Sequence, residues 1–269
     1  MGSQSFYALA RKGIKAFSPR HFKIMKIGII GFSRFGQLLA KILKPYAEVC
    51  VYNRSDKSGI AKDLGVNYVS LEEVCQADWI FVAVAISATE QIIKKISPLL
   101  KRGSLVMDVC SVNVLPAKWL EENISADNEI MTTHPMFGPD SAANGTKGLQ
   151  WVLCPLRISD QNLNELTQIL NKLELKIIET TPDDHDQQAA VSLALVHFIG
   201  RGLEEFGMQN LKITSLGFER LLKVNETVTN DSWQLFLDMQ KFNPYTQEVR
   251  QKFINAIKNV NNKIEKNEH

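Results

Sequence analysis

Apolar runs and amphipathic segments alternate along the first two thirds of the chain. The first run, residues 27–30, is nearly continuous, rich in β-branching and too short for a helix, which is typical of a strand buried on both faces of a parallel sheet. From Phe35 onward, apolar residues recur three and four positions apart. The pattern therefore predicts a strand, a short turn and a helix at the start of the domain.

The same alternation continues as far as residue 181. We expect further strands at 48–52, 79–85, 104–109, 129–133, 151–156 and 175–180, a helical turn at 71–77, and helices at 89–100 and 162–173. Short apolar strands that alternate with helices form a parallel, doubly wound sheet covered by helices. Residues 25–181 are therefore predicted to form an α/β domain of the Rossmann type.

Beyond Pro182 the pattern is helical only, with candidate helices at 187–209, 215–228, 232–242 and 246–266. We expect residues 182–269 to form an all-helical domain for substrate binding and dimerisation. A helical segment of this size is too small to bury all of its apolar faces alone. These faces centre on Leu193, Leu216, Phe236 and Phe253. The sequence therefore predicts a homodimer through the C-terminal helices.

Composition and charge narrow the classes of function. The chain has 269 residues, of which 45% are hydrophobic and 22% charged, an ordinary composition for a soluble globular protein. No stretch approaches the ~20 apolar residues of a membrane-spanning helix. Residues 1–24 hold five of the 31 basic residues and no acidic one, so 26 basic residues face 29 acidic ones in the remainder. We expect neither a membrane nor a nucleic acid as partner of the main domain.

The basic N-terminal extension, residues 1–24, leaves three alternatives open. It could be an organelle transit segment, a loosely attached amphipathic helix, or an upstream translation start ahead of Met25. We favour the last two. They predict a cytoplasmic protein, with a plastid location as the minor alternative.

The cysteines predict neither disulfides nor a metal site. The four cysteines, at positions 50, 75, 110 and 154, show no paired spacing and lie in or beside apolar runs. Buried free thiols in a reducing compartment are the expected reading.

A glycine turn connects the first strand to the first helix. In dinucleotide-binding domains the first glycine allows the tight turn, a small second residue lets the backbone approach the pyrophosphate, and the third glycine lets helix and strand pack closely. The predicted cofactor-binding residues of this turn are Gly31, Phe32, Ser33, Arg34, Phe35 and Gly36. Ser33 replaces the usual second glycine, which places a Cβ and a hydroxyl beside the phosphates.

The end of the second strand points to the identity of the cofactor. An NAD site is expected to place an acidic side chain there for the ribose 2′-hydroxyl. This chain has Asn53, Arg54 and Ser55 instead, and an arginine with a hydroxyl is a better match for a 2′-phosphate. NADP is therefore the predicted cofactor and NAD the less favoured one. The alternative is that Arg54 is an ordinary solvated loop residue.

Several local motifs, in this order, resemble the prephenate/arogenate dehydrogenase family of tyrosine biosynthesis. They are the glycine turn, the Ser111-Val112-Asn113 segment after the fifth strand, the HPMFGPDS segment at 134–141, the His185-Asp186 pair with Ser192 and His197 behind it, and the GFERLL segment at 217–222. The segments at 230–233 and 243–244 look most like plant-type arogenate dehydrogenases. The resemblance covers residues 25 to about 253.

The resemblance implies an NADP-dependent oxidative decarboxylation of prephenate or arogenate. A histidine with a pKa near working pH suits the proton removal that this reaction needs. By the family's pattern, His134 is the catalytic base, with an acidic limb near the ordinary histidine pKa of ~6.5, and Ser111 lies near it and the nicotinamide. The pattern also implies that His197 holds a substrate carboxylate or carbonyl, that Asp140 shapes the mouth of the pocket, and that His185 binds substrate.

The chain departs from the family's pattern at three positions. Lys223 stands where many microbial members have a carboxylate-binding arginine, and Arg220, one turn earlier, could serve instead. Asn113 replaces the family's usual lysine. Cys154 aligns with an acidic residue of plant arogenate enzymes, so the choice between prephenate and arogenate stays open.

Two other functions compete with this reading. An imine or β-hydroxyacid reductase would share the two-domain build, but such enzymes usually carry a lysine or an aspartate on the first helix of the tail, where this chain has Ser192 and His197. A non-catalytic NADP-binding regulatory protein would not need Ser111, His134 and His197 together.

Overall fold

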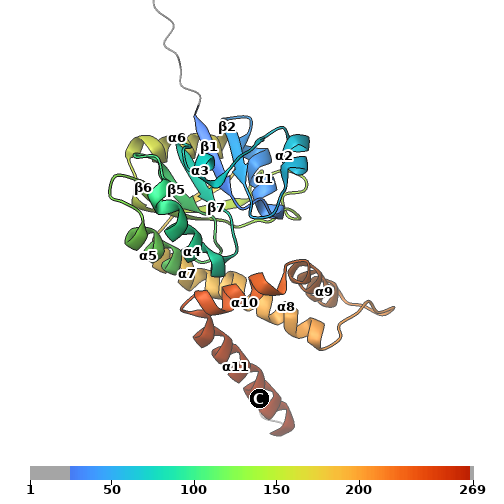
Figure 1. The fold of residues 1–269 in the computed structure, drawn as a ribbon. Helices are drawn as coiled ribbons and strands as arrows, with labels where there is room; N and C mark the ends of the chain where they lie inside the picture. The colour runs from blue at the N-terminus through green and yellow to red at the C-terminus, as the bar shows by residue number, and fades with distance from the viewer. Residues whose placement is uncertain (1–24, 267–269) are drawn as a thin grey trace, which may run out of the picture.

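An eight-stranded sheet forms the centre of the N-terminal part, with helices on both of its faces (Figure 1). The computed structural model describes residues 25–266, so the N-terminal extension 1–24 lies outside the described residues. The strand order is β3-β2-β1-β4-β5-β6-β7-β8. The strands are β1 Lys26–Ile30, β2 Glu48–Tyr52, β3 Asn67–Tyr68, β4 Trp79–Val82, β5 Leu105–Asp108, β6 Glu129–Pro135, β7 Gln150–Arg157 and β8 Lys176–Glu179.

The doubly wound architecture predicted from the sequence is confirmed, with one difference at the edge of the sheet. Strands β1 to β6 are mutually parallel, whereas β7 pairs antiparallel with β6 and parallel with β8. A parallel neighbour needs a crossover, usually a helix. No helix lies between β6 and β7, so the chain returns antiparallel, whereas α6 (Asp160–Lys172) separates β7 from β8.

Two layers of helices bury the faces of the sheet. Helices α1 (Arg34–Leu43), α2 (Ser58–Leu64) and α6 contribute to one hydrophobic core. Helices α3 (Leu71–Val74), α4 (Ile86–Ile96) and α5 (Val114–Asn123) contribute to the other. The sequence reading missed α2, β3 and α5. The apolar pattern of α5 is interrupted by Pro116 in its first turn, where proline is tolerated because the amide there needs no helical partner.

The C-terminal part begins with one long helical rod. It consists of α7 (Pro182–Ala189), the π-helix η2 (Ala190–Leu195) and α8 (Val196–Glu205). The rod starts five residues before the expected position because Thr181 accepts a hydrogen bond from the Asp184 amide, and Pro182 sits at the first helical position. Helices α9 (Leu216–Thr229), α10 (Trp233–Phe242) and α11 (Thr246–Lys266) follow.

Two buried carboxylates fasten the helical part to the sheet domain. Asp186 of α7 accepts hydrogen bonds from the Asn113 and Val114 amides, at the start of α5. Asp238 of α10 accepts hydrogen bonds from the amide and hydroxyl of Ser87, in the first turn of α4. A carboxylate at a helix N-terminus satisfies free amides and complements the helix dipole. The contacts of Asp186 fix the rod, and those of Asp238 fix α10, against the sheet domain.

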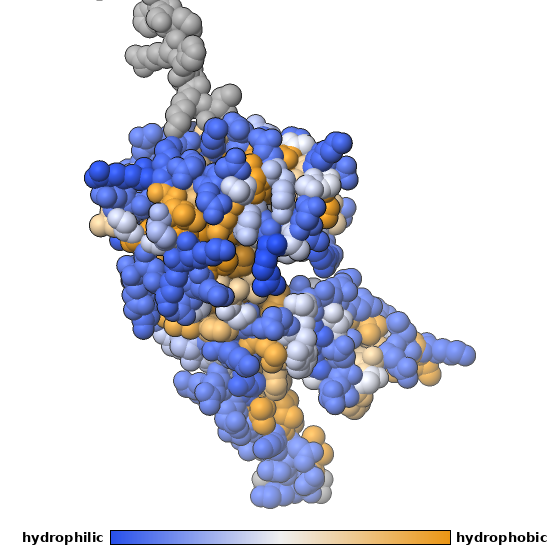
Figure 2. All heavy atoms as spheres, in the orientation of Figure 1, coloured by the Kyte–Doolittle hydropathy of each residue, from blue (hydrophilic) through white to orange (hydrophobic). Residues whose placement is uncertain are grey.

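The far end of the helical part leaves apolar side chains exposed. Helix α11 projects away from the body, and Figure 2 shows apolar atoms along it. Of the four residues on which the dimer prediction rested, Leu216 is exposed, but Phe236 is buried within its own chain and Leu193 packs against the core. A single chain therefore buries Phe236 and half-buries Leu193 but leaves Leu216 exposed, so it does not bury all four. Among residues 25–266, no helix is both long and apolar enough to cross a membrane.

Candidate active site

The turn after β1 requires glycine at two positions. Gly31 has φ +104°, and a Cβ on it would lie 2.3 Å from the Ala83 carbonyl oxygen. A Cβ on Gly36 would lie 2.0 Å from the Gly31 carbonyl oxygen. Neither position can accept a side chain, because backbone atoms already occupy the space. The turn thus has the close strand–helix packing of a dinucleotide-binding site.

The N-terminus of α1 is open to an anion. Ser33 is its N-cap, but its side chain makes no capping hydrogen bond, and its backbone is extended without strain. The first amides of a helix have no partner within the helix, so they are available to a phosphate. The hydroxyl of Ser33 is exposed and does not fill the turn. The turn therefore fits a dinucleotide although Ser33 replaces glycine.

The side chain and the amide of Phe32 both have partners within the protein. Its side chain is completely buried in the core, and its amide donates to Asn53 Oδ1 at 3.0 Å. Phe35 packs on the same core, with its ring centroid 6.4 Å from that of Phe137. The side chains of both phenylalanines are therefore structural, and Phe32 has no amide left for a cofactor.

The loop after β2 is held by a small network of hydrogen bonds. Asn53 Nδ2 donates to Ser55 Oγ at 2.9 Å, and the Tyr68 hydroxyl donates to the Asn53 carbonyl at 2.9 Å. Because Ser55 Oγ accepts from Asn53, its own proton is free for an outside acceptor. Arg54 is exposed beside it. The loop therefore carries an exposed arginine next to a serine whose hydroxyl can donate.

An ion pair connects the cofactor turn with the loop after β6. Arg34 Nη2 lies 2.5 Å from Asp140 Oδ1, and both side chains are about half exposed. The structure thus brings together a residue predicted for the cofactor and one predicted for the mouth of the substrate pocket.

His134 lies at the carboxyl end of β6 and contacts a second histidine, His185. Its Nδ1 is 2.8 Å from His185 Nε2, and His185 Nδ1 is 2.8 Å from Asp186 Oδ1. All three side chains are buried. His134 Nε2 makes no hydrogen bond to any residue that the structure describes. Both ring nitrogens of His185 are occupied by protein partners, so neither is free for a hydrogen bond to a ligand, and its substrate-binding role stays a prediction.

Burial governs the protonation of His134. Loss of hydration, followed by the proximity of the His185 ring, lowers the pKa of His134 well below its ordinary value of 6.5. The neutral imidazole, which can accept a proton, is therefore the resting form over a wider pH range than the sequence suggested.

Ser111 lies three residues beyond β5, the strand next to β6. The ends of neighbouring parallel strands share one edge of the sheet, so Ser111 and His134 belong to the same edge. Ser111 Oγ is buried and has no hydrogen-bond partner within residues 25–266. A buried hydroxyl without a partner is unfavourable, and a ligand at this edge would supply one.

The π-helix sets the direction of His197. In an α-helix eleven residues make about three turns, so His185 and His197, twelve apart, would lie on different faces. The wider π turn takes up one extra residue, which returns His197 roughly to the face of His185. His197 Nδ1 is buried without a partner in the described part of the chain. Burial also lowers the pKa of His197 despite Asp231 nearby, so it offers a neutral donor rather than a charge.

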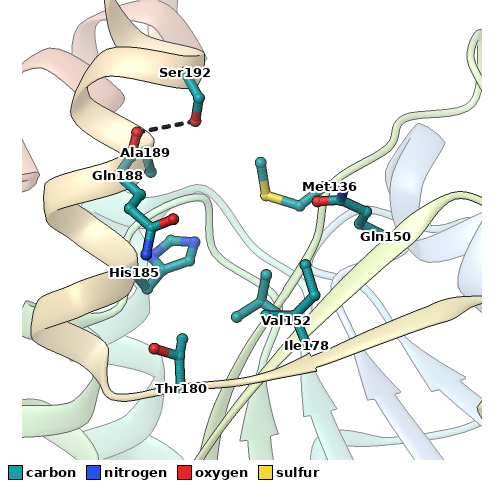
Figure 3. A pocket seen from close by; sticks show the side chains of 9 residues that line it. All are labelled: Met136, Gln150, Val152, Ile178, Thr180, His185, Gln188, Ala189 and Ser192. Atoms are coloured by element: carbon teal, nitrogen blue, oxygen red, sulfur yellow. Dashed lines mark hydrogen bonds between the residues drawn. The ribbon is translucent and has the colours of Figure 1, made fainter.

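A pocket lies between the rod and the last strands of the sheet (Figure 3). Its cavity volume is about 90 Å³, which is below the roughly 300–1,000 Å³ of a typical small-molecule site. It is lined by Met136, Gln150, Val152, Ile178, Thr180, His185, Gln188, Ala189 and Ser192. His134 is not part of this lining, so the pocket reaches the histidine pair from the side of His185. The sequence reading found no signal for this pocket, because its lining comes from segments far apart in the chain.

Within one protomer, the two cations predicted for substrate binding lie away from His134 and His185. Arg220 and Lys223 are exposed on α9, and Lys223 Nζ lies 3.6 Å from Glu226. Helix α9 packs along α8, at the end of the rod away from the sheet (Figure 1). Neither cation belongs to the pocket lining.

Two departures from the family's pattern are in contact. Asn113 Nδ2 lies 3.2 Å from Cys154 Sγ, and both residues are completely buried. Burial raises the pKa of the Cys154 thiol to about 11, so the pair is neutral. The expectation of free thiols is confirmed for all four cysteines, three of them buried and Cys50 partly exposed. No three His, Cys, Asp or Glu side chains converge as metal ligands within residues 25–266.

Comparison with known proteins agrees with this geometry. The model of the family described as prephenate dehydrogenase, nucleotide-binding domain, matches residues 39–179, more than half of the chain. The chain belongs to the prephenate dehydrogenase family. A second model, described as TYRAAT1-like, C-terminal domain, matches residues 202–269. Family membership makes the sheet domain a nucleotide-binding domain of a dehydrogenase, which fits a nicotinamide cofactor.

Two relatives in Arabidopsis thaliana span most of the chain. Arogenate dehydrogenase 1, chloroplastic, is 32% identical and covers 89% of this chain. Arogenate dehydrogenase 2, chloroplastic, is 29% identical and covers 91%. The chain spans 39% of the length of the first relative and 71% of the length of the second.

Solved structures share the fold over about nine tenths of the chain. Prephenate dehydrogenase from Aquifex aeolicus, in complex with hydroxyphenyl propionate and NAD+, has a TM-score of 0.74 at 18% identity and covers 92% of this chain and 93% of its own. Synechocystis arogenate dehydrogenase has a TM-score of 0.69 at 23% identity and covers 90% and 93%. The Rossmann-type domain followed by helices is therefore the architecture of this family.

Proposed function

We propose that the protein catalyses the oxidative decarboxylation of prephenate or arogenate with NADP, which yields 4-hydroxyphenylpyruvate or tyrosine. The observation that carries this proposal is the placement of His134. It is a buried histidine with one free ring nitrogen at the ligand-binding edge of a dinucleotide-binding sheet. The family and the Arabidopsis relatives supply the class of substrate.

The reaction needs one protein base and a held substrate. The C4 hydroxyl gives its proton to the base as the C4 hydride leaves, the ring carboxylate then leaves as CO2 with its bonding electrons passing into the ring, and a proton returns to the oxygen of the aromatic product. His134 Nε2 accepts the hydroxyl proton, because Nδ1 is already bonded to His185. The nicotinamide supplies the hydride acceptor when bound. Ser111, with its unpartnered hydroxyl, would bridge the substrate and the cofactor.

The substrate side chain needs polar contacts further along the rod. We assign this role to His197, whose buried Nδ1 has no partner within the described residues. A neutral imidazole donates one hydrogen bond to a carboxylate or carbonyl. Arg220 and Lys223 stay candidates for carboxylate binding, although neither lies in the pocket lining of its own chain.

The preference for NADP rests on the loop after β2. Arg54 and the free Ser55 proton would hold the 2′-phosphate, and the amides at the start of α1 would hold the pyrophosphate. Asn53 positions the loop and carries no charge that would repel the phosphate. Arg34 would contact the cofactor only after leaving Asp140.

Assembly and location remain predictions. A homodimer through the helical part agrees with the apolar side chains exposed there. A cytoplasmic location is the first expectation. The names of the Arabidopsis relatives include chloroplastic, which supports the plastid alternative.

The test is to incubate the protein with prephenate or arogenate plus NADP or NAD, and to follow absorbance of the reduced cofactor. Reduction of NADP with release of CO2 is the expected result. Turnover of a hydroxyacid or an imine in place of both cyclohexadienes would favour the reductase. Cofactor binding without turnover of any substrate would favour a regulatory protein.

A further inference from the structure

Asp186 is the fixed end of a chain of hydrogen bonds that ends at His134. Its Oδ1 accepts from the Asn113 amide at 2.7 Å, and its Oδ2 accepts from the Val114 amide at 3.0 Å. Amides can only donate, so both carboxylate oxygens act as acceptors. The two hydrogen bonds hold this completely buried side chain at the N-terminus of α5.

The carboxylate decides which nitrogen of His185 carries the proton. His185 Nδ1 lies 2.8 Å from Asp186 Oδ1, and two atoms this close, one of them an acceptor, require a proton on Nδ1. In the neutral ring Nε2 is then bare. His185 Nε2 is therefore an acceptor.

The next hydrogen bond sets His134 in the same way. His134 Nδ1 lies 2.8 Å from His185 Nε2, so His134 must donate from Nδ1. We propose that Asp186 and His185 are positioning residues that fix the tautomer of His134 and leave its Nε2 unprotonated. This inference rests on the proposed function only in naming the C4 hydroxyl of the substrate as the source of the proton.

The chain also gives the accepted proton a stabilised position. When the substrate O–H bond breaks, an N–H bond forms at His134 Nε2 and the ring becomes an imidazolium. Its Nδ1 proton can shift to His185 Nε2, which places the positive charge next to Asp186. The other titratable groups packed near this chain are Asp108 at the end of β5, whose pKa burial raises to about 7, and the thiols of Cys110 and Cys154. None of these three groups can carry a positive charge, so none would repel the imidazolium.

The first experiment reads the tautomers directly and needs no substrate. Heteronuclear NMR of the full chain with 15N-labelled histidine distinguishes a protonated from a bare ring nitrogen, and His134→Asn and His185→Asn variants assign the signals. We expect a proton on Nδ1 and a bare Nε2 for both rings at neutral pH. A proton on His134 Nε2, or an imidazolium at His185, would overturn the inference.

The second experiment compares two replacements of His185. Glutamine reaches the position of Nε2 and can offer an oxygen to His134 Nδ1, whereas asparagine reaches only the position of Nδ1 and keeps the contact with Asp186. We expect His185→Asn to lower kcat by roughly 10²-fold with KM nearly unchanged, and His185→Gln to restore most of it, since a positioned base contributes about 10²–10⁴-fold. In His185→Asn the acidic limb should also rise toward the ordinary histidine value.

Gln187→Ala is the matched control, because Gln187 is exposed on the same helix and bonds Asp183 and Tyr245 instead of the histidines. Equal losses in the asparagine and glutamine variants, with an unchanged pH profile, would reduce His185 to a packing role. The predicted tautomers without any turnover of prephenate or arogenate would refute the proposed function and leave the positioning inference standing.

Discussion

The sheet domain and the helical part of this protein differ in how completely one chain covers its own apolar surface. Strands β1, β4 and β5 are buried on both faces, and helices from two layers close over them. In the helical part, Phe206 is 81% exposed and Ile213 is 91% exposed. Large apolar side chains left in water forgo about 1.5–3 kcal/mol each. The sheet domain therefore buries its apolar strands within one chain. The helical part leaves apolar side chains exposed, which a second copy of the chain could cover.

The largest effect should come from His134, the proposed base in the sheet domain. Replacing His134 by Asn keeps a polar side chain of similar size but removes the base, so kcat should fall by roughly 10²–10⁴-fold with a much smaller change in substrate affinity. Steady-state kinetics with both candidate substrates measures it. A rate within a few-fold of the parent would mean that His134 only shapes the loop.

Cofactor choice should depend on the sheet domain alone. Arg54→Ala should weaken NADP binding by about 10–100-fold, the worth of one or two charge-assisted hydrogen bonds, and leave NAD binding nearly unchanged. Binding titrations with the two cofactors measure the difference. Arg102→Ala, which removes an equally exposed arginine paired with Asp127, is the control. Equal losses for NADP and NAD would remove Arg54 from the phosphate site.

Packing inside the helical part can be probed with two glycines of the same helix. A Cβ on Gly200 would lie 2.2 Å from Val228 Cγ2 of α9, whereas a Cβ on Gly202 meets nothing within 4 Å. Gly200→Ala should therefore lower the free energy of unfolding by about 1–3 kcal/mol, and Gly202→Ala should raise it by up to about 1 kcal/mol. Denaturant unfolding of both variants is the measurement. Equal stability of the two would show that α9 shifts freely against α8.

Self-association should depend on the helical part, and within it on helix α11. The apolar stripe of α11 is formed by Phe253, Ile257, Val260 and Ile264, at spacings of four, three and four, which is a coiled-coil seam. Ile257→Glu should weaken self-association by about tenfold, and Asn259→Glu, which adds the same charge on the opposite face, should not. Light scattering of the parent at micromolar concentration should show twice the chain mass of 30.3 kDa. A monomer would contradict the dimer.

The smallest effect concerns pH. In the proposed mechanism neutral His134 is the active form, and burial lowers its pKa well below 6.5, so the neutral form persists as pH falls through that value. The acidic limb of kcat/KM should therefore lie below pH 6.5 and should be absent in His134→Asn. A limb at or above 6.5 would indicate that His134 is hydrated in the free enzyme.

The site was predicted unevenly from the sequence. The strand–turn–helix start and the glycines came directly from local pattern, because a turn of this shape excludes side chains at Gly31 and Gly36. His134 was found through its motif. The hydrogen bonds of His185 could not be found in this way. Nothing local shows that its two ring nitrogens contact Asp186 and His134, because His134 is 51 positions away.

The sequence by itself determined the elements whose signal lies within a few residues: the apolar strands, the glycine turn and the long helix α11. The predicted strands also placed Ser111 and His134 at strand ends. Only the tertiary structure decided the reversal of β7, the docking of Asp186 on α5 and the order Asp186–His185–His134. Hydrogen bonds between segments far apart in the chain depend on how layers pack, and packing direction leaves no periodic trace in the sequence.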